Sequence, residues 1–153
     1  MAGRPGDSTK HTGTAQSAAA PNGGISTIEV AVSPGELIDK ISILQIKSER
    51  IADSEKLKNV MHAFKILQDA RHASLAQSNE LSRLESELKA INEALWDIED
   101  EIRACEAAKD FGPRFIELAR SVYKTNDRRA ATKKKIDELF GSALTEEKSY
   151  QDY

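Results

Sequence analysis

The chain has 153 residues, of which 31% are charged and 5% aromatic, and its formal net charge is −3. This balance favours amphipathic helices over a β-sandwich or a barrel, and the small net charge argues against general binding to nucleic acid. No run of about 18 apolar residues occurs, so we expect no membrane-spanning helix, and a single cysteine excludes a disulfide within the chain.

Residues 1–24 are rich in Ser, Thr, Ala and Gly and have no large apolar residue except Met1. Such a segment buries too little surface to offset the entropy lost on ordering, so we predict a disordered leader. It also lacks the apolar stretch of a secretory signal, which makes a cytoplasmic setting the expectation. One folded domain is predicted over residues 25–150.

A β-branched run over residues 25–32 predicts one short strand or extended segment. A strand needs a partner. Three arrangements stay open: pairing across a dimer axis, pairing with the C-terminal tail, and extended packing against helices.

The sequence Ser33-Pro34-Gly35-Glu36 predicts the start of a helix that ends near Ile51. The hydroxyl of Ser33 can accept a hydrogen bond from the amide of Glu36, the Glu36 side chain can return it, and Pro34 suits the first helical position.

A second helix is predicted to begin at a cap formed by Asp53 or Ser54 and to end near Arg71 and His72, where cations favour the helix dipole. Because the loop between the two helices is short, we expect them to be antiparallel neighbours.

The longest pattern is a coiled-coil-like pair of helices at about 79–108 and 113–140, separated by Gly112-Pro113. In the first, apolar residues alternate steps of three and four, as in a coiled-coil seam. In the second, the stepping reaches polar residues before apolar ones return. The apolar seam of the first helix is Leu81, Leu84, Leu88, Ile91, Leu95, Ile98, Ile102 and Cys105. The same stepping in the second helix gives Phe115, Ala119, Val122, the polar Asn126, Arg129 and Lys133, and then Ile136 and Phe140.

These two helices carry opposite charge. Residues 80–110 hold ten acidic and four basic side chains, a net charge of −6, and residues 113–135 hold eight basic and two acidic side chains, a net charge of +6. Folding back about Gly112 would place Asp97 near Lys124 and Glu101 near Arg120. We expect the charges to select the antiparallel pairing, and their mutual neutralisation further weakens a nucleic-acid role.

The polar interruption allows two interpretations. In one, Asn126 fixes the register of the helix pair as a buried Asn does in coiled coils, and the arginines are solvated. In the other, the basic residues with Tyr and Asn form a pocket for a small anion, since guanidinium groups bind phosphate or carboxylate through two hydrogen bonds. The residues of this candidate ligand site are Arg114, Arg120, Tyr123, Lys124, Asn126 and Arg129.

No catalytic residue, metal site or cofactor is predicted. The three histidines are isolated, Cys105 has no histidine near it in sequence, and no glycine-rich phosphate loop occurs. Four carboxylates between Asp97 and Glu101 are scattered around one helix, so they form no oxygen cage for a cation.

Several segments together resemble a bacterial family of short domains of unknown function. They are Ser33-Pro34-Gly35-Glu36-Leu37-Ile38-Asp39-Lys40, Leu95-Trp96-Asp97-Ile98-Glu99-Asp100, Phe115-Ile116-Glu117-Leu118-Ala119-Arg120-Ser121-Val122-Tyr123, Asn126-Asp127-Arg128-Arg129 and Glu146-Glu147-Lys148-Ser149-Tyr150. The resemblance implies a helical, cytoplasmic protein and a tail that belongs to the domain. It brings no activity and no catalytic residues, and relatives occur with proteins of glycan synthesis.

We therefore predict an all-α protein of antiparallel helical hairpins that acts as an interaction module. It is expected to be a homodimer or other homo-oligomer and to bind a partner protein or a small anionic ligand, with no role at nucleic acid or membranes. The alternative is a small-molecule enzyme or sensor that uses the basic cluster on a phosphorylated or nucleotide-linked sugar; an apolar exposed surface would favour the first and a concave, converging cluster the second.

Overall fold

The computed structural model describes residues 27–145 and 147–149. The chain divides into two units, Met1–Ala31 and Val32–Tyr153. In the first unit, residues 27–31 are exposed and form neither helix nor strand, so the strand predicted over 25–32 is not found in these residues. The predicted leader at 1–24, Ile25 and the end of the tail at Tyr150 lie outside the described residues.

The second unit contains four helices, and no strand occurs in the described part of the chain, so the all-α prediction is confirmed. Helix α1 (Pro34–Arg50) begins as predicted: the Ser33 hydroxyl accepts a hydrogen bond from the Glu36 amide at 3.2 Å, and Pro34 is the first helical residue. The Glu36 carboxylate, however, accepts from lysine side chains, as described below.

Removal of the α1 cap tests this helix start. Ser33→Ala is expected to lower the free energy of unfolding by about 1 kcal/mol, because the Glu36 amide loses its acceptor. Ser54→Ala, at the first exposed residue of the next helix, is the matched control and should change stability less, since Ser54 is not the capping residue there. Equal effects in urea denaturation would contradict the capping role of Ser33.

Helix α2 (Ser54–Ser74) is capped by Asp53, whose carboxylate accepts a hydrogen bond from the Lys56 amide at 2.9 Å. This resolves the choice between Asp53 and Ser54. The helix ends with Arg71 and His72 in its last turn, as predicted from the favourable position of cations there.

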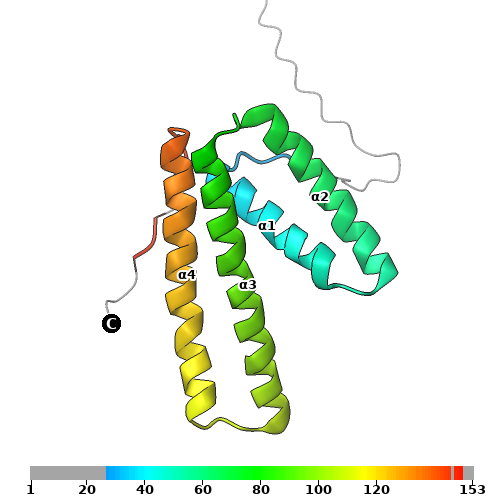
Figure 1. Ribbon diagram of the computed structural model, residues 1–153, viewed down its shortest axis with the longest axis vertical. Coiled ribbons are helices and arrows are strands. Elements are labelled where there is room, and N and C mark those ends of the chain that lie inside the picture. The colour runs from blue at the N-terminus through cyan, green and yellow to red at the C-terminus, as the bar shows by residue number, and fades with distance from the viewer. Residues whose placement is uncertain (1–26, 146, 150–153) are drawn as a thin grey trace, which may run out of the picture. The chain divides into compact units, whose positions relative to one another are not determined.

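Helices α3 (Asn79–Ala108) and α4 (Pro113–Leu139) form the predicted long antiparallel hairpin, with a short connection between them (Figure 1). Lys109 ends α3 in the left-handed conformation, with φ of 56°. Gly141 has φ of +59° just after α4, a conformation in which glycine avoids the strain of a side chain.

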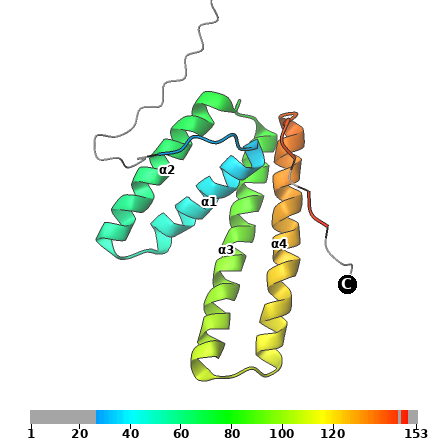
Figure 2. The ribbon, with the colours of Figure 1, turned by 180° about the vertical axis from the view of Figure 1, so that it is seen from behind.

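Helix α1 is the centre of this unit, because it contacts α2, α3 and α4. The views from opposite sides agree that α1 lies against one half of the α3–α4 hairpin and that α2 lies on the outside of α1 (Figures 1 and 2). The buried apolar core joins α1, α3 and α4, and its members are Leu37, Ile38, Ile41, Leu81, Leu84, Leu88 and Ile136.

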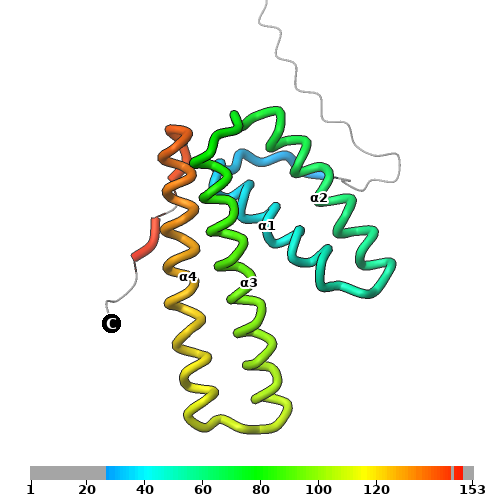
Figure 3. The backbone as a smooth tube through the Cα atoms, viewed as in Figure 1, coloured from blue at the N-terminus to red at the C-terminus, as the bar shows by residue number. Residues whose placement is uncertain are grey.

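The other half of the hairpin extends beyond α1 to the connection at 109–112 (Figure 3). We call this the distal half and define it as residues 95–108 of α3 and 113–126 of α4. The apolar seam of α3 reports the difference: Leu84 and Leu88 are fully buried, whereas Ile98 and Ile102 are only half-buried. Among the described residues, α1 reaches only the start of the distal half, where Arg50 pairs with Asp97, so the interior farther along is formed by α3 and α4.

The register predicted for α4 differs from the structure. Leu118, Thr125 and Thr132 are buried, while Ala119 is exposed and Asn126 is half-buried. The physical reason is that α4 has two neighbours, so one side of it packs on α3 and a second side meets α1. The prediction assumed a single seam and mixed residues of the two sides.

Candidate functional site

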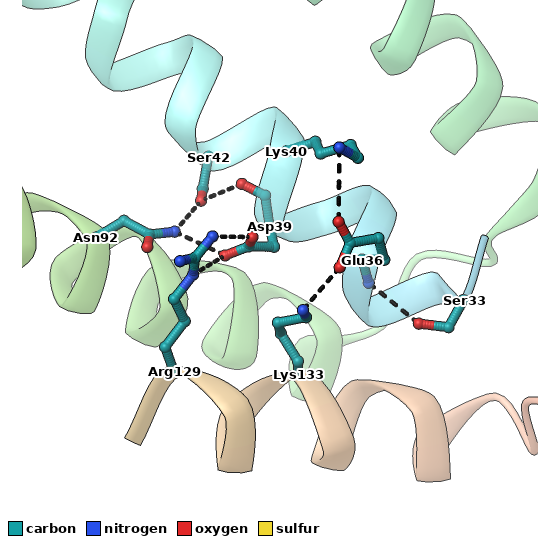
Figure 4. Close-up of polar contacts among 8 residues, drawn as sticks. All are labelled: Ser33, Glu36, Asp39, Lys40, Ser42, Asn92, Arg129 and Lys133. Atoms are coloured by element: carbon teal, nitrogen blue, oxygen red, sulfur yellow. Dashed lines mark hydrogen bonds and ion pairs between the residues drawn. The ribbon is translucent and has the colours of Figure 1, made fainter. Parts of the chain in front are cut away.

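A buried carboxylate lies where α1, α3 and α4 meet. Asp39 on α1 is 1% exposed. Arg129 on α4 donates from Nε to Asp39 Oδ1 at 2.8 Å and from Nη2 to Oδ2 at 2.5 Å, so the pair is bidentate (Figure 4). Asn92 on α3 donates from Nδ2 to Oδ1 at 2.9 Å. Three donors from two helices thus compensate the loss of water around one carboxylate.

The same network is completed by Ser42, one turn further along α1. Asn92 Nδ2 also donates to Ser42 Oγ at 2.7 Å, and Ser42 donates to the backbone oxygen of Asp39 at 2.8 Å. Among the described residues no buried side-chain nitrogen or oxygen lacks a hydrogen-bond partner. The cluster of Asp39, Ser42, Asn92 and Arg129, which we call the buried polar cluster, is a satisfied structural network.

A second set of contacts ties the first turn of α1 to α4. Glu36 accepts from Lys133 at 2.7 Å and lies 3.5 Å from Lys40 on its own helix (Figure 4). The amide of Gly35 donates to Asp137 Oδ1 at 2.7 Å in a buried position. A Cβ at Gly35 would lie 2.4 Å from the Lys133 carbonyl oxygen, so glycine is required here by close approach of the two helices.

The six predicted ligand-site residues do not converge on one place. Arg129 belongs to the buried polar cluster. Arg114 pairs with Glu101 and with Glu117, near the connection between α3 and α4. Arg120 and Lys124 line an open hollow of about 450 Å³ whose walls all come from α4. Tyr123 is 37% exposed.

Asn126, the remaining member, is half-buried. Within the described residues, Arg120 and Lys124 have no ion-pair partner. The candidate ligand site therefore remains a prediction, with Arg129 explained by the fold and Arg120 with Lys124 as its most accessible members.

Some charged side chains of α3 and α4 pair with each other, and others pair with a different helix. Glu101 pairs with Arg114, and Glu87 lies 3.7 Å from Lys135. Asp97, expected near Lys124, accepts instead from Arg50 on α1. Arg50 also lies over the Trp96 ring, 5.7 Å from its centroid, which places Trp96 against α1 as a cation–π partner.

Thr132 links α4 to α3 through a carboxylate. Its hydroxyl donates to Glu87 Oε1 at 3.0 Å and, with Lys135 and Arg83, holds the pKa of Glu87 below its usual value. Because the folded pKa is lowered, this carboxylate stabilises the fold above its unfolded pKa, and the contribution disappears as the pH falls through the folded pKa.

Thr132→Val is expected to raise the pKa of Glu87 towards its usual value, since the hydroxyl hydrogen bond is the largest cause of the shift. The change is nearly isosteric, so the helix pair should persist. An NMR titration of the Glu87 carboxyl carbon measures the shift, with Ser121→Ala as the control, because the Ser121 hydroxyl donates to a carbonyl of its own helix. An unchanged Glu87 titration in Thr132→Val would show that the hydrogen bond is absent.

The side of the hairpin that α1 covers continues into the distal half, where α1 reaches only the upper end, at Trp96 and Asp97. On α4 the α1-facing residues include Lys133 and Asp137, and steps of seven residues back along the helix return to about the same side. The same holds on α3, where Lys89 and Asn92 contact α1. We call the continuation the distal face and define it by Trp96, Glu99 and Arg103 on α3 and Ile116, Ala119, Tyr123 and Asn126 on α4.

On α4 the distal face combines Ile116, Ala119 and Tyr123 with the polar Asn126, and Arg120 lines the same hollow as Ile116; on α3 it combines Trp96 with two charged residues. Ile116 is 56% exposed, and Ala119 is exposed next to it. Trp96 lies at the upper end, in a groove of about 400 Å³ that it forms with Ile43, Leu95 and others, including Arg129 at the buried polar cluster. Exposed aliphatic and aromatic side chains on one continuous side are typical of an interaction surface.

No group of three or more His, Cys, Asp or Glu side chains in the described part of the chain is placed to hold a metal ion. Cys105 is half-buried on the seam of α3. None of the described helices combines the length and apolar character needed to cross a bilayer.

Sequence reasoning missed Asp39, Ser42 and Asn92. A signal for two of them was present: Gly35, Asp39 and Ser42 follow steps of four and three on the side of α1 that also carries buried Ile38 and Ile46. Small and polar residues on the buried side of a helix indicate close helix approach and internal hydrogen bonding.

Comparison with known proteins adds one finding. The chain matches no curated protein and no solved structure. A family model described as a family of unknown function, DUF6165, matches residues 28–152, which include all four helices and the buried polar cluster. The chain therefore belongs to this family of unknown function.

Proposed function

We propose that the protein is a helical interaction module that binds a protein partner through the distal face. The observation that carries this proposal is the position of Ile116, Ala119 and Tyr123. They lie on the side of α4 that α1 covers in the other half of the hairpin, and in the distal half this side is exposed.

The composition of the distal face supports a protein as the bound molecule. Trp and Tyr are the residues most enriched among those that dominate binding energy at protein interfaces, and Ile116 adds apolar area beside them. The surface is extended along two helices rather than enclosed, which suits a helix or helix pair better than a small molecule.

The buried polar cluster argues against the pocket alternative at Arg129. Both carboxylate oxygens of Asp39 accept hydrogen bonds from this guanidinium, and Asp39 is 1% exposed. An anionic ligand at Arg129 would have to displace the buried carboxylate of Asp39, which would then be left without its cation. An enzyme or sensor acting on a sugar phosphate remains an alternative prediction, centred on Arg120 and Lys124.

Photo-crosslinking in living cells tests the proposal. A benzophenone amino acid introduced in place of Tyr123 is expected to cross-link to a bound protein, and the same group in place of His62, exposed on α2, is expected not to. The supporting result is a cross-link that mass spectrometry assigns to a defined peptide and that the additional change Ile116→Asp abolishes. Equal cross-linking at both positions, or cross-links that persist in Ile116→Asp, would refute the role of the distal face.

A further inference from the structure

We infer that the partner on the distal face is a second copy of this chain, bound antiparallel through the same face. The inference rests on the proposed function and adds the identity of the partner. The dimer would contain a four-helix arrangement made of α3 and α4 from both copies. In it, the distal half of each hairpin would be covered by the other hairpin, as the other half is covered by α1.

The order of residues on α4 is self-complementary. Ile116 and Tyr123 lie three and four residues on either side of Ala119. When two such helices pack antiparallel about a two-fold axis at Ala119, Ile116 of each copy faces Tyr123 of the other. The small side chain of Ala119 at the axis lets the two helix backbones approach closely. The exposed Ile116 of each copy would then be covered by the Tyr123 ring of the other.

The charges on α3 repeat this symmetry. Glu99 and Arg103 pair within the helix at 3.3 Å, and both side chains are well exposed. In the antiparallel arrangement, Glu99 of each copy lies opposite Arg103 of the other, so each carboxylate keeps a cation.

The position of α1 selects the antiparallel arrangement. The contacts of α1 with Asn92 and Arg129 lie on the side of the hairpin that continues into the distal face, so an antiparallel arrangement keeps the α1 helices of the two copies at opposite ends. In the antiparallel arrangement, the tip of each hairpin points towards the α1 of the other copy. The exposed Phe111, at the tip, then lies near the partner's groove at Trp96.

A disulfide at the proposed axis tests the arrangement directly. In the full chain with Cys105→Ala, the change Ala119→Cys is expected to give a covalent dimer under mild oxidation, because a residue at a two-fold axis meets its own copy within disulfide range. Ala131→Cys, an exposed alanine outside the distal face on the same helix, is the control and should stay mostly monomeric. No covalent dimer from Ala119→Cys, or equal yields from both variants, would overturn the inference.

Sedimentation equilibrium separates this inference from the proposed function. The wild-type chain is expected to be a dimer and Ile116→Asp a monomer with unchanged helical circular dichroism, since Ile116 is exposed and contributes little to the fold of one copy. A monomeric wild type whose position 123 still cross-links to another protein would overturn the second copy and keep the interaction module. A monomeric wild type without specific cross-links would refute both.

Discussion

Arg129→Ala is expected to lower the free energy of unfolding by about 3–5 kcal/mol, the cost of leaving a buried carboxylate without its cation. Asp39 is 1% exposed and receives two of its hydrogen bonds from Arg129. Without Arg129, Asp39 would keep the hydrogen bond from the uncharged Asn92 amide but lose its cation. Since small domains have a total stability of about 5–15 kcal/mol, a large fraction of the native stability depends on this one side chain.

Urea denaturation followed by circular dichroism measures the loss. Arg128→Ala is the matched control, because Arg128 is the neighbouring arginine and is exposed, and it should change stability by less than about 0.5 kcal/mol. Similar values for the two arginines would mean that Asp39 is not held by Arg129. The same result would reopen Arg129 as a ligand residue.

Gly35→Ala is expected to destabilise the fold by about 1–3 kcal/mol or more, although alanine is normally the better helix former. The added Cβ would lie 2.4 Å from the Lys133 carbonyl oxygen and 2.9 Å from Asp137 Oδ1, so the backbones of α1 and α4 must move apart. That movement also strains the hydrogen bond from the Gly35 amide to Asp137. Helix propensity and close packing thus predict opposite signs, and packing should decide.

Gly112→Ala is the control for this change. A Cβ at Gly112 would meet only the flexible side chain of Asp110, at 3.1 Å, and replacement of an N-cap glycine has a modest cost. Thermal unfolding of both variants should show the larger decrease in midpoint for Gly35→Ala. A Gly35→Ala protein as stable as the wild type would show that α1 and α4 are farther apart than described.

The helices could be predicted from the sequence because their ends are encoded locally. Ser33 and Asp53 accept hydrogen bonds from amides three residues ahead, and Gly112-Pro113 separates the two long helices as expected. The antiparallel hairpin followed from a short connection and opposite charge. Each of these features depends on residues close together in the chain, so the sequence pattern alone was enough.

The role of Arg129 could not be predicted, because its partner lies 90 residues away. From sequence, a guanidinium near Tyr and Asn suggested an anion site, and the anion turned out to be the chain's own Asp39. The register of α4 could not be predicted for a related reason. Thr132 is buried and bonds Glu87 on α3, while Arg129 reaches Asp39 on α1, and one periodic seam cannot represent two neighbours.

This assignment changes how a ligand search should be designed. Loss of ligand-induced stabilisation in Arg129→Ala would be ambiguous, because that variant damages the fold itself. Arg120→Ala is the informative variant for a small anion, since Arg120 is exposed and lines the hollow on α4 with Lys124.

The most direct test of the account is a double-mutant cycle on Asp39 and Arg129. The free energies of unfolding of the wild type, Asp39→Ala, Arg129→Ala and the double variant give the coupling between the two side chains. We predict a coupling of about 2–3 kcal/mol, with the double variant more stable than the sum of the single losses implies. Additive losses, with a coupling near zero, would contradict the buried ion pair on which the positions of α1 and α4 and the assignment of Arg129 to the fold depend.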